Sequence, residues 1–194
     1  MSSLEQIKKI REQTGAGIVD VKKALTESEG DETGAIEILR KKGGDKAVKK
    51  SDRSAGEGVI GTYIHSNQKI GAMVKVMCET DFVARNEDFQ MLVKDIAMHI
   101  TAASPVCLMP EDLDAETIGK EREIWSAQLE EEGKPADITQ KILEGKEKKF
   151  REESALMTQS FVKDPDKTVQ DLINEAVIKI GEKIEISDFV RYSL

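Results

Sequence analysis

The most distinctive chemistry in the sequence lies in residues 78–89, where an acid, Asp81, directly precedes a large aromatic, Phe82. This segment falls between an alternating apolar run, typical of a strand, and an amphipathic run with helical period. An aromatic side chain held at a corner between two rigid elements can anchor another protein. Alternatively, Phe82 folds back under the following helix and caps the core. The residues alone favour the second interpretation, because most large apolar side chains are buried inside the protein.

Patterns that would indicate an enzyme are missing from the sequence. It contains no phosphate-binding GxxxxGK[ST] loop, no GxGxxG after a strand, no HExxH and no nucleophile elbow. The cysteines, Cys78 and Cys107, and the histidines, His65 and His99, have neither the spacing nor the neighbours of a metal site. The carboxylates lie in charged helical runs, where nothing would raise a pKa. We therefore expect a binding protein, not an enzyme, with no cofactor and no metal.

Composition limits the class of partner. Of the 194 residues, 34% are charged and 4% are aromatic, which indicates a helix-rich protein with a modest core. The net charge of −8 argues against binding nucleic acid through the whole surface. We expect no membrane partner, because no apolar run reaches spanning length, and the start lacks the apolar segment of a signal peptide. A reducing, cytoplasmic location follows from these features and from the two scattered cysteines.

The first 45 residues are predicted to form a three-helix bundle. Apolar residues recur at helical spacing in three short runs, which are separated by Thr14–Gly17 and by Gly30 and end at Gly43. None of these helices is long enough to be stable alone, so they must pack against one another. The residues expected inside are Leu4, Ile7, Ile10, Ile18, Val21, Leu25, Ala35, Ile38 and Leu39.

A basic stretch, residues 46–57, is predicted to be a solvated linker. It carries Lys46, Lys49, Lys50 and Arg53 among small residues. Binding to RNA phosphates is the alternative, but no aromatic is interleaved that could stack on a base.

Residues 58–194 are predicted to form an α+β core. A β-hairpin spans Val59–Ile64 and Ile70–Cys78, and a helix capped by Asn86 follows it. The last helix starts at Thr168, and a terminal strand completes a three-stranded antiparallel sheet. On that strand, one face is expected to carry Ile184, Ile186, Val190 and Tyr192.

A densely charged insertion at about 111–158 is predicted to form an antiparallel helical hairpin, broken at Gly133. Its charged residues are most simply explained as the solvent-exposed faces of the two helices. Its single tryptophan, Trp125, is expected to be a core anchor. A docking arm that uses Trp125 as a contact is the alternative.

Two segments resemble the signatures of bacterial translation elongation factor Ts. They are Arg11–Leu25, which reads REQTGAGIVDVKKAL, and Thr80–Asn86, which reads TDFVARN. Their order and spacing agree with that family over nearly the whole chain. Val21 replaces a common cysteine, and Ser187-Asp188 replaces a basic pair before Phe189.

The resemblance implies guanine-nucleotide exchange on elongation factor Tu. It also implies that residues 1–45 form a ubiquitin-associated-like module, and that this short form pairs two protomers into a homodimer. Phe82 would insert into the partner's G domain, Asp81 would disturb the magnesium environment, and Thr80 and Val83 would fix the turn.

In this family, the face matching Arg11, Ile18 and Val19 grips the same G domain. A non-catalytic adaptor that uses the N-terminal bundle is the alternative function. A nucleic-acid-binding module resting on residues 46–53 is a third, and we expect no direct contact with nucleic acid.

Overall fold

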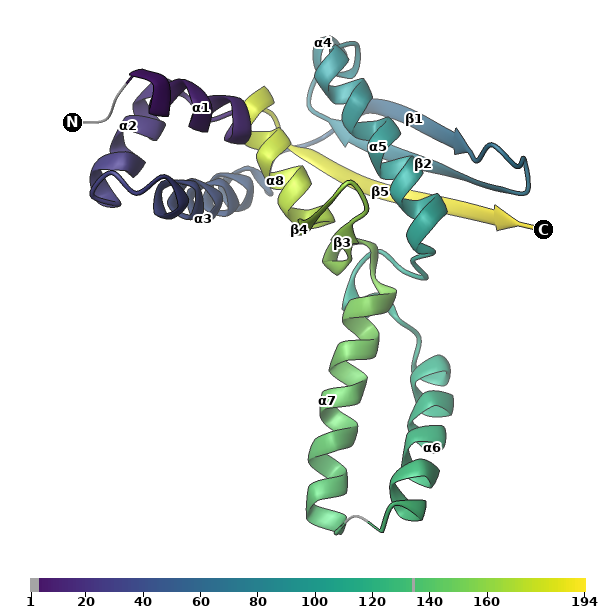
Figure 1. Ribbon diagram of the computed structural model, residues 1–194. Helices are drawn as coiled ribbons and strands as arrows, with labels where there is room; N and C mark the ends of the chain where they lie inside the picture. Colours follow the sequence, from purple (N-terminus) through teal and green to yellow (C-terminus); the bar gives the residue numbers. More distant parts are fainter. Residues whose placement is uncertain (1–3, 134) are drawn as a thin grey trace. The chain divides into compact units, whose positions relative to one another are not determined.

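The computed structural model describes residues 4–133 and 135–194 and has the predicted α+β architecture. The chain divides into two compact units, one comprising Met1–Thr101 with Gln170–Leu194 and the other comprising Ala102–Val169. The elements in chain order are α1 (Leu4–Thr14), α2 (Ile18–Glu27), α3 (Glu32–Lys50), β1 (Glu57–Ile64), β2 (Ile70–Cys78), α4 (Asp81–Ala84), α5 (Glu87–Ala103), the 3-10 turn η1 (Pro110–Asp112), α6 (Ala115–Glu131), α7 (Ala136–Ser154), η2 (Leu156–Thr158), β3 (Ser160–Phe161), β4 (Asp164–Thr168), α8 (Val169–Ile180) and β5 (Ile184–Ser193) (Figure 1).

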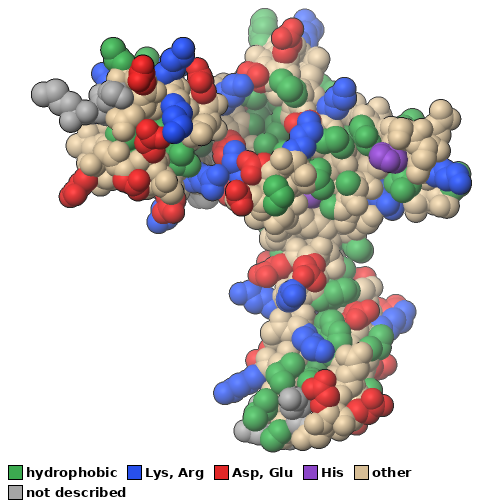
Figure 2. Space-filling view, in the orientation of Figure 1, with side chains coloured by type: hydrophobic (Ala, Val, Ile, Leu, Met, Phe, Trp, Pro, Cys, Tyr) green, Lys and Arg blue, Asp and Glu red, His purple; other side chains and the backbone are tan. Residues whose placement is uncertain are grey.

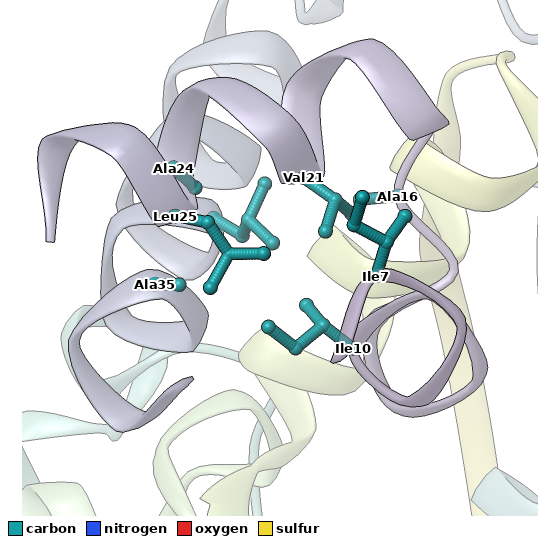
Figure 3. Packing of buried hydrophobic residues seen from close by; sticks show 8 residues of the cluster. Ile7, Ile10, Ala16, Val21, Ala24, Leu25 and Ala35 are labelled. Atoms are coloured by element: carbon teal, nitrogen blue, oxygen red, sulfur yellow. The ribbon is translucent and has the colours of Figure 1, made fainter. Parts of the chain in front are cut away.

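The N-terminal three-helix bundle is confirmed. Its buried side chains come from all three helices and point toward one another (Figure 3). Gly15 adopts a left-handed φ of 66° directly after α1, a conformation that glycine reaches without strain. Leu4, expected inside, is instead 84% exposed because it begins α1. The buried residues of this core are Ile7, Ile10, Ala16, Val21, Ala24, Leu25, Ala35 and Leu39.

The predicted end of the third helix at Gly43 was wrong, because α3 continues to Lys50. Glycine inside a helix is unfavourable by only about 1 kcal/mol relative to alanine, and the lysines that follow are good helix formers. Gly43 is also buried where an added Cβ would lie 2.2 Å from Cδ1 of Ile178, so a larger residue there would force the side chain of Ile178 to shift. Residues 46–50, expected in a linker, are therefore helical; the side chains of 45–49 lie outside what the structure describes. The division into domains at 1–45 and 58–194 stays a prediction.

The predicted hairpin and terminal strand form a three-stranded antiparallel sheet in the order β1-β2-β5. In the β1–β2 turn, the N–H of Gln68 donates to the carbonyl oxygen of His65. Helix α5 packs closely against β1, because a Cβ added to Gly61 would lie 2.3 Å from Val93. One face of β2 is buried through alternate residues, Ala72, Val74, Val76 and Cys78. The opposite face carries exposed apolar side chains.

The prediction that four apolar residues of the last strand share one face was wrong. The register between β2 and β5 shifts at Ser187, which has no counterpart on β2. Such a bulge adds one residue, so the alternation of side chains reverses beyond it. Ile184 and Ile186, before the bulge, are buried, whereas Val190 and Tyr192 are 39% and 73% exposed.

The second unit contains the predicted helical hairpin, formed by α6 and α7. The ring of Trp125 meets that of Phe150 edge to face at 5.7 Å, and Glu147 forms ion pairs with Arg122 and Arg151. The hairpin surface carries side chains of both charges (Figure 2). A short pair of strands, β3 and β4, was not predicted. Among the described helices, none is both long and apolar enough to cross a membrane.

Candidate partner-binding site

The acidic-aromatic segment folds as a single helical turn, α4, between the end of β2 and the start of α5. Thr80 is its N-cap: the side-chain oxygen accepts the N–H of Val83 at 3.4 Å. Asn86 caps the next helix, because its Oδ1 accepts the N–H of Asp88 at 2.8 Å. Two caps six residues apart therefore produce a sharp corner, as expected of residues that prefer helix N-termini.

Phe82 lies on the outside of this corner. Its side chain is 80% exposed, whereas Ala84 and Phe89 turn inward and are buried. The interpretation that Phe82 caps the core was therefore wrong, because these two residues already occupy the inner side. Hydrophobic side chains are visible at the surface over α4, beside side chains of both charges (Figure 2). An exposed aromatic on a capped turn has the features of an anchor for a partner.

An acid and a base stand beside the aromatic. Asp81 Oδ2 lies 3.1 Å from Nη2 of Arg85, one helical turn later. Both side chains are well exposed, so this pair contributes little to stability. The Asp81 carboxylate thus remains accessible from solvent next to Phe82.

The corner is held from a distant part of the chain by Glu182, which lies between α8 and β5. Its Oε2 accepts the backbone N–H groups of Glu79 and Thr80, each at 3.1 Å. Its Oε1 accepts the hydroxyl of Thr80 at 2.7 Å. The sequence analysis missed Glu182, because no local pattern distinguishes it from the chain's other acids.

Glu79, in the corner, makes a corresponding hydrogen bond to the turn that carries Glu182. Its Oε1 accepts the N–H of Lys183 at 2.6 Å, and Nη1 of Arg53 lies 3.3 Å from the same carboxylate. The hydrogen bond from Lys183, with the charge of Arg53, holds the pKa of Glu79 below its ordinary value. The two turns are therefore bound to each other reciprocally. Glu182 accepts backbone N–H groups of the corner, and Glu79 accepts a backbone N–H group of the α8–β5 turn.

Cys78, at the end of β2, is a buried thiol under the corner. Its Sγ donates to the carbonyl oxygen of Thr80 at 3.2 Å. Burial, and next the charge of Glu182, raise the pKa of Cys78. These surroundings favour the neutral thiol, which is a poorer nucleophile than the thiolate.

The second set of predicted site residues lies on the N-terminal bundle. Ile18 and Val19 begin α2 and are 48% and 65% exposed, although Val21 two residues later is fully buried. Arg11 is exposed in the last turn of α1. Of this set, Ile18 was expected inside on the basis of periodicity, and that expectation was wrong. The first turn of α2 therefore presents an apolar surface outward.

A third surface is the open face of the sheet. In the register, Val190 pairs with Met73, and Ile64 and Tyr192 flank Gly71 from opposite sides. All four side chains are at least 39% exposed. We call this surface, together with Ile60 of β1, the open sheet face. Nowhere in the described chain do three His, Cys, Asp or Glu side chains gather as a metal ion would require.

Comparison with known proteins agrees with these features. The family model described as "Elongation factor TS" matches residues 5–194. A protein named elongation factor Ts from Geobacter metallireducens is 53% identical over 189 residues, which cover 97% of this chain and 88% of that protein. One of the same name from Thermosipho melanesiensis is 50% identical over 194 residues, covering 100% of this chain and 99% of that protein.

Proposed function

This chain belongs to the elongation factor Ts family, and we propose that it is the guanine-nucleotide exchange factor of elongation factor Tu. It binds the GDP form of that protein, releases GDP and allows GTP to load. The observation that carries the proposal is the exposed Phe82 on a corner that is capped at both ends and braced from the far end of the chain. The protein needs no active site of its own, and its place is with translation in the cytoplasm.

In the proposed mechanism, Phe82 inserts between helices of the partner's G domain. The bound nucleotide is held there by its phosphates and by a magnesium ion, whose charge dominates that site. The inserted ring shifts the elements that hold the ion and the β-phosphate. Asp81 brings a negative charge beside the ring and disturbs the environment of the magnesium ion. Thr80 and Val83 keep the turn in shape, as supported by their mutual hydrogen bond.

The bundle provides the affinity. Arg11, Ile18 and Val19 grip the G domain, so that the corner is delivered to the nucleotide site. Two exposed apolar side chains and an exposed arginine suit an interface with an apolar centre and a charged rim.

We propose further that the working form is a homodimer joined through the open sheet face. This face exposes Ile60, Ile64, Met73, Val190 and Tyr192, and the register places Thr62, Lys75 and Asp188 on it as well. A group of exposed apolar side chains of this kind marks a candidate interaction surface. The occupant that fits is a second copy of this chain, because the face is continuous across all three strands and can pair with itself around a two-fold axis.

Thermodynamic linkage sets a check on the proposal. If the protein weakens the binding of GDP, then GDP must weaken the binding of the protein by the same factor. Stopped-flow release of labelled GDP from elongation factor Tu is the test, with acceleration by this protein as the expected result. Binding without acceleration would overturn the exchange function and favour the adaptor. A salt-sensitive complex with RNA would favour the nucleic-acid alternative.

A further inference from the structure

The turn between α8 and β5 lies against the corner that carries Phe82. Cys78, the last residue of β2, pairs with Ile184, the first residue of β5, so the segments just outside this pair are neighbours. Gly181, with a left-handed φ of 88°, ends α8 and places Glu182 between the two elements. The carboxylate of Glu182 then collects three donors from the corner: the N–H groups of Glu79 and Thr80 and the hydroxyl of Thr80.

These contacts define the direction in which the hydroxyl of Thr80 points. Because the hydroxyl proton is donated to Glu182, the oxygen's lone pairs remain available to accept the N–H of Val83. That second hydrogen bond caps α4, which has only four residues and is too short to be stable alone. Phe82 is exposed, so packing of its own ring does little to hold it in place. Its orientation therefore depends on how the α4 turn is held, and the cap whose hydroxyl is bound by Glu182 is one of the contacts that hold it.

We infer that Glu182 is a positioning residue for the exchange reaction. It holds the α4 turn so that Phe82 is already oriented when the partner arrives. Ordering a mobile turn during binding costs free energy, and a turn that is ordered in advance avoids this cost. The inference rests on the proposed exchange function, but Glu182 itself is placed behind the corner and acts through Thr80 and Phe82.

The kinetic test is a double-mutant cycle in the stopped-flow assay of GDP release. Loss of hydrogen bonds to a charged acceptor predicts that Glu182→Ala slows release about tenfold. Glu182→Gln retains one acceptor oxygen and should fall between Glu182→Ala and the wild type. If Glu182 works through the ring, then adding Glu182→Ala to Phe82→Ala should cause no further loss. Full additivity of the two losses would overturn the inference, as would unchanged release by Glu182→Ala. The matched control is Glu185→Ala on β5.

A second measurement requires no partner and so separates this inference from the proposed function. Hydrogen exchange at the amides of Thr80 and Val83 should accelerate in Glu182→Ala, while the amide of Gln90, bonded to Asn86 within the next helix, should stay protected. Unchanged protection at both corner amides would overturn the positioning role, whatever the exchange assay gives. If Glu182→Ala fails to fold, Thr80→Val removes the hydroxyl that links Glu182 to the cap. Exchange at the amide of Val83 should then accelerate, whereas the amide of residue 80, which still donates to Glu182, should stay protected. A wild type that leaves GDP release unchanged would refute the exchange function alone.

Discussion

The carboxylate of Glu182 binds both the backbone N–H and the hydroxyl of Thr80, 102 positions earlier in the chain. This pair links the end of the hairpin to the start of the terminal strand, at the corner that presents Phe82. The shape of the proposed exchange site is therefore a property of the assembled sheet and not of the local segment alone.

Removing the ring of Phe82 should slow GDP release severely and leave the fold intact. The side chain is 80% exposed, so Phe82→Ala removes little internal packing. A buried aromatic anchor at an interface contributes about 2 kcal/mol or more, which corresponds to a reduction of roughly 30-fold or more in GDP release. Circular dichroism checks the fold, and Met91→Ala, at an exposed apolar position on α5, is the control. Normal GDP release by folded Phe82→Ala would rule out the wedge.

The bundle face should contribute to affinity. Val19→Ser changes an exposed side chain at the start of α2, so we expect weaker binding to elongation factor Tu with unchanged helix content. Titration calorimetry measures the affinity, and Lys41→Ser on α3 is a control at another exposed position.

Deleting residues 1–50 should weaken binding further and leave the sheet folded. The docking role would be wrong if the truncated protein bound as tightly as the full chain.

The open sheet face should determine the oligomeric state. Light scattering across a dilution series should give a mass about twice the 21.5 kDa of one chain. Val190→Lys places a charge in this apolar face and should split the dimer, with GDP release impaired in parallel. Ile124→Lys adds the same charge at an exposed apolar position on α6 and should leave the dimer intact. A single-chain mass at every concentration would refute the dimer.

Glu79 should stabilise the fold in a pH-dependent way. Its pKa in the folded state lies below the ordinary value of 4.5, because the carboxylate accepts the N–H of Lys183 and faces Arg53. A depressed pKa contributes stability that is fully present above the unfolded pKa and is lost as the pH falls through the folded pKa. Glu79→Gln should therefore be less stable than the wild type at pH 7, and the difference should shrink below about pH 4.

Urea unfolding at both pH values measures this difference. Glu57→Gln, at an exposed position on β1, is the control and should show a smaller loss at neutral pH. A stability difference that stayed constant from neutral to acid pH would contradict the assignment of the stabilising contacts to the ionised carboxylate.

The single tryptophan should report on the second unit. Trp125 stacks edge to face on Phe150 within the α6–α7 hairpin. Phe150→Ala should shift the tryptophan emission and lower the stability of the hairpin by about 3 kcal/mol at most, since such rings are only partly buried here. GDP release should change little, because none of the proposed site residues lies in this unit. A large loss of exchange would instead support the docking-arm alternative.

Local pattern was sufficient for most of the elements and for the family. Helical periodicity, the cap at Asn86 and the alternation along β2 depend on neighbours within a few residues, so the sequence alone predicted the bundle, the hairpin strands and the corner that follows them. The same local signal marked Asp81 and Phe82 as candidates. It failed at Gly43, where the lysines beyond it let the helix continue, and it favoured an inward Phe82, which is exposed.

Tertiary structure decided what depends on contacts between distant segments. The exposure of Phe82 follows from Ala84 and Phe89 occupying the inner side of the corner, which no local pattern reveals. The bulge at Ser187 reverses which residues of the last strand face outward, because register is set by pairing with β2. The role of Glu182 appears only when two turns meet at the paired ends of β2 and β5. A carboxylate acquires such a role from the donors around it, and the fold alone brings those donors together.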